Sequence, residues 1–126
     1  MDITPQVAEH RQVVRKYDAT GFDISGVRHE GPILVFPSET RPWPFVGSID
    51  ALHADDLGDV FAADPPVEIL LIGTGSGFLM VSVDLRQTLR GKGVGVECMD
   101  TGAACRTYNV LLGEERQVAA ALLPGA

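Results

Sequence analysis

Strand-like and helix-like stretches alternate through the second half of the sequence, and this order constrains the fold more than any other feature. Residues 67–72 are apolar at every position except Glu68, as in a strand that is buried on both faces. In residues 83–90, Leu85 and Leu89 lie four positions apart, which is typical of one face of a short helix. A further strand, helix and strand are predicted over residues 94–98, 101–113 and 117–123. This succession predicts an α/β half in which helices layer on a sheet.

The first half of the sequence is β-rich. Short apolar runs, punctuated by turn residues, fill residues 12–36, and residues 33–36 are apolar on both faces, which predicts a central strand. Residues 37–44 carry three prolines, each of which removes a ladder donor, so we expect no strand there. Residues 45–52 are predicted to return as a β segment, and residues 53–66 to form a short helix that ends at two prolines.

Length and charge limit the class of protein. A chain of 126 residues without a break in composition fits one domain, predicted over residues 12–126, after a loose N-terminal arm at residues 1–11. The net charge of −7, with no basic cluster, disfavours nucleic-acid binding. Residues 1–21 show the pattern of neither a secretory signal nor a mitochondrial presequence, and the longest uncharged stretch, residues 69–83, is too short to span a bilayer. We therefore expect a cytoplasmic, bacterial-type protein with no transmembrane segment.

Residues 99–123 gather polar side chains that suggest a catalytic site at first sight. As a helix, however, residues 101–113 present one core-facing apolar stripe, formed by Ala104, Cys105, Tyr108, Leu111 and Leu112. Thr101 is predicted as the N-cap, with Asp100 favoured by the helix dipole. Asn109 is unfavourable inside a helix, so we expect its amide to bond a group outside the helix, near residues 114–116. We interpret the polar side chains as caps and edges of a structural element.

Glycines at positions 73, 75 and 77 follow a buried strand and bear some likeness to a dinucleotide-binding turn. The full fingerprint needs a further glycine where Phe78 stands, and a helix that opens at once. The spacing therefore favours a tight turn, and no cofactor is predicted. A ligand loop stays open as the alternative, because open α/β sheets bind ligands at the carboxyl ends of their strands. Its residues would be Gly73, Thr74, Gly75, Asp100 and Thr101.

The cysteines and histidines do not form a recognisable reactive set. Cys98 and Cys105 are seven positions apart, which matches no zinc-binding or redox spacing. Both lie on apolar faces, so we expect them to be buried and unreactive. The three histidines, His10, His29 and His53, all precede the C-terminal half, so nothing places a base beside either cysteine. No catalytic residue and no metal site is predicted.

Trp43 stands between two prolines on a segment that is too stiff to pair freely as a strand. Such a tryptophan either folds back on the core or offers a preordered anchor to a partner. We predict a partner-binding surface formed by Arg41, Trp43 and Phe45. The apolar residues 78–81 are the second candidate surface.

Three stretches, residues 21–37, 69–75 and 99–123, carry a family resemblance. Over about residues 15–123 the chain resembles a small single-domain family of unknown function, which includes mitochondrial complex I assembly factor 3, the adipogenesis-associated domain protein and many bacterial proteins. The most specific part of the match consists of Thr101, Ala104, Tyr108, Asn109, Leu111, Arg116 and Val118. Within it, Tyr108, Asn109 and Arg116 are predicted to form a structural motif.

The resemblance implies a three-layer α/β fold, no established enzymatic activity, and a chaperone-like or scaffolding role through protein partners. With the pattern above, we predict a single α/β domain with three layers, a mixed central sheet with helices, and a β-rich N-terminal half. Two departures stand out. The family usually has Glu-Gly-Arg where this chain has Glu114, Glu115 and Arg116, so the turn must be made differently, with Gly113 as one candidate. The family also tends to a polar loop where residues 78–81 are apolar.

We therefore predict a non-enzymatic protein-binding or assembly-factor-like module, which the resemblance links to respiratory complex I biogenesis. Its expected partner is a protein of unknown identity, and the chain is expected to be a monomer or a weak homo-oligomer. The alternative is a small-molecule-binding protein or weak enzyme that uses residues 73–77 and the start of the helix at residues 101–113.

Overall fold

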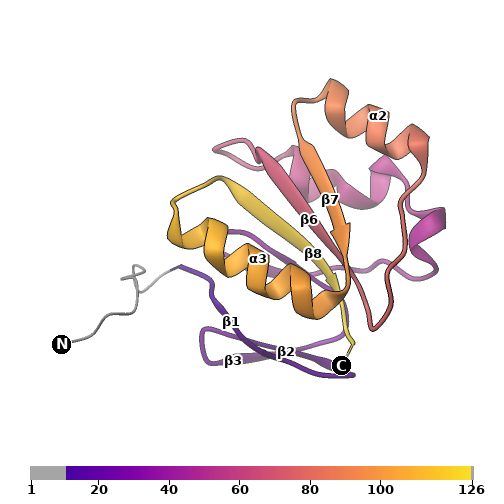
Figure 1. Ribbon diagram of the computed structural model, residues 1–126. Helices are drawn as coiled ribbons and strands as arrows, with labels where there is room; N and C mark the ends of the chain where they lie inside the picture. The colour runs from indigo at the N-terminus through magenta and orange to yellow at the C-terminus, as the bar shows by residue number, and fades with distance from the viewer. Residues whose placement is uncertain (1–10, 126) are drawn as a thin grey trace.

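The computed structural model describes residues 11–125, which form two sheets and the helices that cover them (Figure 1). The predicted arm at residues 1–11 lies outside the described residues, apart from Arg11. The first sheet is an antiparallel meander in the order β1-β2-β3. Its strands are β1 (Val14–Tyr17), β2 (Gly21–Ile24) and β3 (Val27–Glu30). Phe22 and Ile24 of β2 are buried and turn toward the rest of the molecule.

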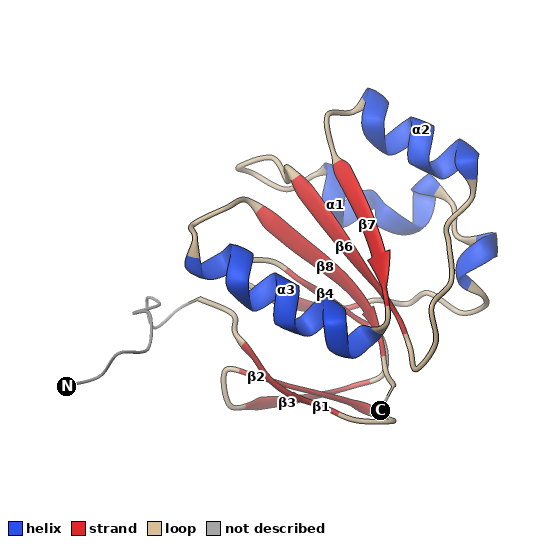
Figure 2. Ribbon diagram, viewed as in Figure 1, coloured by secondary structure: helices blue, strands red, loops and turns tan. Residues whose placement is uncertain are grey.

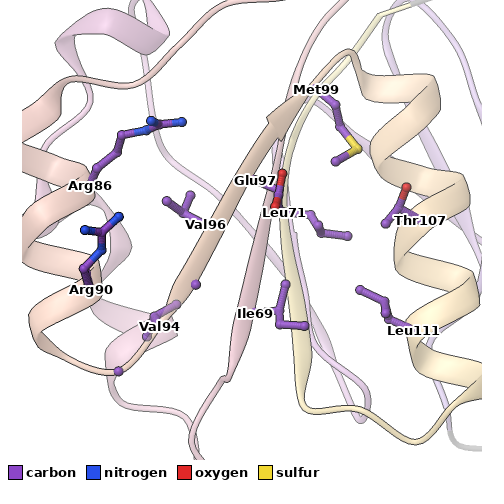
Figure 3. A pocket seen from close by; sticks show the side chains of 12 residues that line it. Ile69, Leu71, Arg86, Arg90, Val94, Val96, Glu97, Met99, Thr107 and Leu111 are labelled. Atoms are coloured by element: carbon purple, nitrogen blue, oxygen red, sulfur yellow. The ribbon is translucent and has the colours of Figure 1, made fainter.

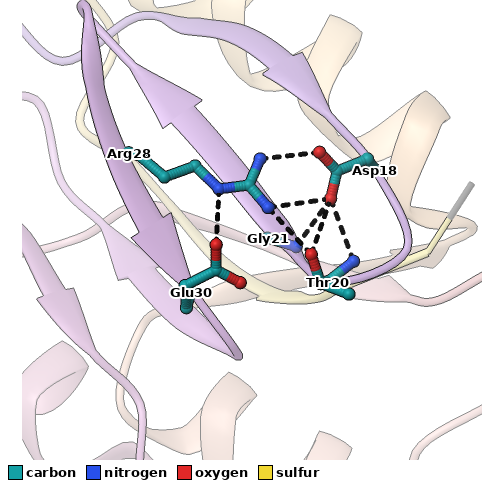
Figure 4. Close-up of polar contacts among 5 residues, drawn as sticks. All are labelled: Asp18, Thr20, Gly21, Arg28 and Glu30. Carbon is teal, nitrogen blue, oxygen red and sulfur yellow. Dashed lines mark hydrogen bonds and ion pairs between the residues drawn. The ribbon is translucent and has the colours of Figure 1, made fainter.

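A polar cluster fastens the turn between β1 and β2 to β3 (Figure 4). The Asp18 carboxylate accepts hydrogen bonds from the backbone amides of Thr20 (2.9 Å) and Gly21 (3.0 Å). It also accepts two from the Arg28 guanidinium, at 2.6 and 3.0 Å, and Arg28 Nε donates to Glu30 at 2.9 Å. Arg28 and then the Thr20 amide hold the pKa of Asp18 well below its usual range. Each side chain of the cluster takes part in at least one of these bonds, and together they shape the hairpin.

The second sheet is mixed and has the strand order β5-β4-β8-β6-β7. β6 runs parallel to both β8 and β7, whereas β4 is antiparallel to β8 and β5. The strands are β4 (Ile33–Val35), β5 (Thr40–Pro42), β6 (Ile69–Thr74), β7 (Gly95–Met99) and β8 (Val118–Leu123). β7 therefore forms one edge of the sheet, and β6 and β8 form its parallel centre.

The crossover helices lie on opposite faces of this sheet, which gives the molecule three layers (Figure 2). α2 (Val83–Gly91) leads outward from β6 to β7, and α3 (Thr101–Gly113) leads back past β6 to β8. Because parallel crossovers are right-handed, reversing the direction of travel moves the helix to the other face. α3 and the meander cover one face, and α2, α1 (Gly58–Phe61) and two 3₁₀ turns at residues 49–51 and 54–57 cover the other.

Side chains alternate along β8 between the two cores. Val118, Ala120 and Leu122 pack under α3, whereas Ala119 and Ala121 pack on the side of α2. The predicted α/β fold with three layers, a mixed sheet and a β-rich first half is confirmed. The predicted helix over residues 101–113 is confirmed at both ends.

Two predictions in the first half are wrong. Residues 37–44 include the short strand β5, and this is tolerated because β5 is an edge strand, where Pro42 needs no donor on the solvent side. Residues 45–52 form a loop and a 3₁₀ turn instead of a β segment. Ile49 and Leu52 are both buried, and their spacing of three fits a 3₁₀ turn as well as it fits an irregular strand.

The turn after α3 is made by Glu115, at the position where the resemblance implies a glycine. Glu115 adopts a left-handed conformation, with φ at 61°. Its amide donates to the Leu112 carbonyl (2.9 Å), and the Arg116 amide donates to the Leu111 carbonyl (3.1 Å), which closes a Schellman motif. Glu115 itself, rather than Gly113, thus occupies the position that favours glycine. A side chain at this φ costs conformational energy.

Glu115→Gly should raise the free energy of unfolding by about 1 kcal/mol, because glycine adopts the left-handed conformation without the steric cost of a Cβ. Denaturant unfolding of the two proteins measures the difference. Glu114→Gly is the matched control, since Glu114 has φ at −87° and gains nothing from glycine. A stabilisation that is equal in both variants, or absent from Glu115→Gly, would contradict this account.

Candidate functional site

The five residues of the predicted ligand loop do come together, at the carboxyl end of β6 and the start of α3. The Thr101 hydroxyl is fully buried, accepts a hydrogen bond from the Gly75 amide (2.9 Å) and donates one to the Leu123 carbonyl. The Thr101 amide donates in turn to the Gly75 carbonyl (2.9 Å). One side chain therefore joins the ends of β6 and β8 to the first turn of α3.

Gly73 and Gly75 serve this junction. A Cβ on Gly73 would lie 2.8 Å from a Leu122 methyl group and 3.1 Å from the Thr101 hydroxyl, so a larger residue would require these neighbours to shift. Gly75 has φ at 90°, in the region that favours glycine. A Cβ on Gly125 would lie 2.6 Å from the Gly75 backbone, so the C-terminal segment closes over the turn. Gly73 also belongs to β6, which continues two residues beyond its predicted end at residue 72.

The remaining polar groups of the junction are bonded within it. The Thr74 hydroxyl lies within hydrogen-bonding distance of the Gly77 and Met99 carbonyls. Asp100 accepts from the Ala103 amide (2.9 Å) and is the N-cap of α3, so the prediction of Thr101 as N-cap is off by one position. Thr101 is instead the first helical residue, because its hydroxyl is engaged across the sheet. The side chains thus build a structural joint, in which both threonine hydroxyls are engaged and Asp100 caps the helix.

Tyr108 and Asn109 hold the start of β1 and the residues before it against α3. The Asn109 side chain accepts from the Val14 amide (3.0 Å) and donates to the Val14 carbonyl (2.8 Å), as a neighbouring strand would. Its partner lies outside the helix as expected, but 95 residues away in sequence rather than near residues 114–116. The buried Tyr108 hydroxyl lies 2.9 Å from the Gln12 carbonyl and 3.2 Å from the Phe36 carbonyl. Arg116 takes no part and approaches Glu68 at 4.0 Å on the surface.

Cys105 has the environment of a core residue. It is buried beneath α3, and desolvation raises the pKa of its thiol to about 12, so the thiol stays protonated at neutral pH. Cys98 is half-buried on β7 against the other core. Among residues 11–125, no group of three or more His, Cys, Asp and Glu side chains is arranged to hold a metal ion. Burial and the raised pKa disfavour Cys105 as a nucleophile, and Cys98 is less buried than the sequence predicts.

Trp43 folds back on the core, so its predicted role as an exposed anchor is wrong. Its side chain is only 3% exposed, and its indole N–H donates to the Asp56 carbonyl (2.8 Å). The ring stacks on Phe45, which is also buried, with 4.9 Å between ring centroids. Arg41 is accessible but is paired with Glu39 (3.0 Å) and Asp59 (3.2 Å). The two prolines direct the tryptophan inward, and the surface of Arg41, Trp43 and Phe45 is mostly closed.

The second candidate surface is accessible. Phe78, Leu79 and Met80 are 61%, 48% and 42% exposed, whereas Val81 is buried and fixes the end of the segment. We call residues 78–80 the apolar loop. It follows the turn at Gly75 and leads into α2, so both of its ends are anchored to the sheet and its helices. An anchored, accessible run of large apolar side chains can offer contact area at little ordering cost.

A groove of about 780 Å³ lies along β7, between α2 and α3 (Figure 3). Arg86 and Arg90 reach toward it from α2, and Thr107 and Leu111 from α3. Sequence reasoning missed this feature. Its one signal was the pair of arginines four positions apart, but nothing in the sequence showed that β7 would be an edge strand.

The chain is thus a small three-layer α/β domain, in which helices cover both faces of a mixed sheet and a β-meander packs on one of them. The chain belongs to the family described as "Protein of unknown function (DUF498/DUF598)", whose model matches residues 14–123. This confirms the resemblance found in the sequence.

Among its relatives, the NADH dehydrogenase [ubiquinone] 1 alpha subcomplex assembly factor 3 of Xenopus tropicalis is 37% identical over 111 residues, which are 88% of this chain and 60% of that protein. This chain thus spans less than two thirds of the length of that relative. A crystal structure described as an outer membrane protein from Bartonella henselae has a TM-score of 0.83 and 35% identity, covering 94% of this chain and 98% of that one. The solution structure of a Bordetella pertussis protein, described as a Mth938-like domain, has a TM-score of 0.80 and 28% identity, covering 98% and 92%. In the described part of this chain, no helix has the length and apolar character needed to cross a membrane.

Thr101→Val should lower the free energy of unfolding by about 2–4 kcal/mol. Valine has nearly the same shape as threonine, but it leaves the Gly75 amide and the Leu123 carbonyl without their hydrogen-bond partner. Thr101→Ser is the control that keeps the hydroxyl and removes only a methyl group. Denaturant unfolding compares the two. If valine proves as stable as serine at this position, the hydroxyl does not hold the junction.

Trp43→Ala should lower the free energy of unfolding by about 3–5 kcal/mol, because it empties a buried aromatic site. Trp43→Phe fills most of that space and loses the hydrogen bond to Asp56, so its cost should be smaller, about 1–2 kcal/mol. Thermal and denaturant unfolding measure both. An unchanged unfolding midpoint for Trp43→Ala would contradict the burial of Trp43 and would favour its role as an exposed partner anchor.

Proposed function

We propose that this chain is a non-enzymatic protein-binding module that acts in the assembly of a larger complex. The observation that carries the proposal is the apolar loop, residues 78–80, which presents three large apolar side chains in succession from a fixed base. Apolar surface of this kind is a common mark of a protein–protein contact. The proposed partner is a protein with a complementary apolar patch.

The relatives supply the biological setting of this proposal. Several are named as assembly factors of NADH dehydrogenase [ubiquinone], and the assembly of respiratory complex I is the analogy we carry over. Those proteins are longer, so the analogy extends only to the domain they share with this chain. The prediction of a cytoplasmic protein is kept as part of the proposal.

The hydrogen bonding at the start of α3 supports a binding role over an enzymatic one. A catalytic or ligand site needs polar groups directed at a substrate. The hydroxyls of Thr74 and Thr101, the Asp100 carboxylate and the Gly75 backbone are instead bonded to groups of the same junction. No feature of the junction favours the alternative of a small-molecule site.

The proposal predicts that the double variant Phe78→Ser, Leu79→Ser loses its native partner. Tagged wild-type and variant chains are used to capture partners from native cells, and the captured proteins are compared by mass spectrometry. Removing two side chains that the partner would bury should weaken capture tenfold or more, since each contributes on the order of 1.5–3 kcal/mol when it is buried in a complex. The thermal midpoint should stay nearly unchanged, because both side chains are exposed.

The matched control is Val46→Ser, Val110→Ser, which removes two exposed apolar side chains elsewhere on the surface (93% and 60% exposed). This control should capture the partner as the wild type does. If the loop variant captures the same proteins at the same yield, the apolar loop is not the docking surface and the proposal fails.

A further inference from the structure

The two edges of the central sheet differ. β5, at one edge, is three residues long and ends in Pro42, which removes a donor and blunts the edge. β7, at the other edge, has five residues and no proline, and no strand of the described chain pairs with its outer side. The groove along β7 lies between α2 and α3 (Figure 3). An unblunted edge strand within a groove can accept an additional strand.

The register of β7 shows which backbone groups face the groove. The Gly95 amide donates to the Glu68 carbonyl (2.9 Å), and Gly95 pairs with β6 in a parallel ladder. Because alternate residues of a strand direct their backbone groups to opposite sides, Val96 and Cys98 direct their N–H and C=O groups away from β6. These are the groups that an added strand would bond.

The two walls of the groove have different chemistry (Figure 3). Arg86 and Arg90 of α2 lie on one side, whereas Thr107 and Leu111 of α3, together with Leu71 of β6, lie on the other. Side chains of an added strand would alternate between these walls. One set would meet guanidinium groups, and the other a surface that is largely apolar apart from Thr107 and the Glu97 carboxylate of β7.

The arginines of the groove lack the carboxylate partners that three other arginines in this chain have. Arg28, Arg41 and Arg116 each lie within 4.0 Å of a carboxylate oxygen. Within residues 11–125, neither Arg86 nor Arg90 forms an ion pair, although the chain carries a net charge of −7. Arg86 Nε is buried with no acceptor among the described residues. Like charges at i and i+4 also disfavour a helix, so an external anion would relieve α2 of a cost.

We propose that this groove binds an extended segment of a partner protein, which adds to the sheet beside β7 and places Asp or Glu side chains on Arg86 and Arg90. The charge on α2 selects the acidic side chains, and the wall formed by α3 and β6 receives the alternating apolar ones. The inference rests on the proposed function in one respect, that the partner is a protein. It assigns the specificity of binding to a surface separate from the apolar loop.

The test uses a displayed library of random seven-residue peptides, selected on the full chain. Enriched peptides should alternate acidic and apolar residues. Arg86→Glu, Arg90→Glu should weaken their binding at least tenfold and should enrich basic peptides when selected itself. Arg15→Glu, Lys16→Glu makes the same change in net charge at two exposed positions of β1 and should leave binding unchanged. Enriched peptides without acidic residues, no enrichment at all, or equal loss in both variants would overturn the proposal.

Backbone pairing is tested separately by amide exchange with and without an enriched peptide. The Val96 and Cys98 amides should exchange fast in the free chain and at least tenfold more slowly in the complex. Val96→Pro removes only an outward donor and should weaken binding at least tenfold. The charge-reversal variant keeps the test decisive if this proline variant does not fold. Unchanged exchange at both amides, or a concentration-dependent dimer that buries β7 against a second copy, would overturn strand addition by a partner.

Failure of this inference and failure of the proposed function give different results. If Phe78→Ser, Leu79→Ser loses the native partner while no peptide binds the groove, the proposed function stands and strand addition is wrong. If peptides bind the groove while the loop variant captures its partner normally, the groove is confirmed and the apolar loop is not the docking surface.

Discussion

The buried hydroxyl of Thr101 is the interaction on which the arrangement of the second half depends. It joins the end of β6 to the end of β8 at the point where α3 begins. The reversal that takes the chain from β7 back across β6 must start at this point, so the joint fixes where α3 lies on the sheet. The glycines before it follow from the same constraint, because the Gly73 backbone lies against Thr101 and Leu122. What resembles a ligand-binding turn in the sequence is a close contact within the core.

This joint also explains why the first half needs α3. The meander has only three short strands and cannot bury its apolar face alone. Phe22 and Ile24 complete the core beneath α3, and Asn109 pairs with Val14 as if it were part of a strand. A polar residue that weakens an isolated helix therefore binds the two halves together. The side chains of Tyr108 and Asn109 thus connect α3 to the chain segments of both sheets through hydrogen bonds.

The sequence predicted most reliably the elements whose periodicity is local. The apolar stripe of α3 follows from spacing alone, and the strand at the end of the chain from its apolar run. The right-handed crossover places their ends together, so the proximity of Gly75 and Thr101 was predictable. The partner of Asn109 was not, because it depends on a contact 95 residues away. The prediction that residues 37–44 form no strand failed for a related reason. Pro42 is compatible with a strand only when that strand lies at the edge of its sheet, as β5 does. The groove is a product of topology, because β8 inserts between β4 and β6 and leaves β7 outermost.

The distribution of departures from the family pattern separates scaffold from surface. Glu115 stands where the resemblance leads us to expect a glycine, and the helix end has its hydrogen bonds in spite of an unfavourable φ. The apolar loop stands where the resemblance leads us to expect a polar one, and it lies between the turn at Gly75 and the buried Val81. Met80 then brings its sulfur to 4.0 Å from the Arg86 guanidinium, so the loop borders the groove along β7. In the proposed complex, a partner that covers the loop with apolar side chains would meet two arginines that lack carboxylate partners within residues 11–125. The two proposed surfaces would then act together in selecting a partner.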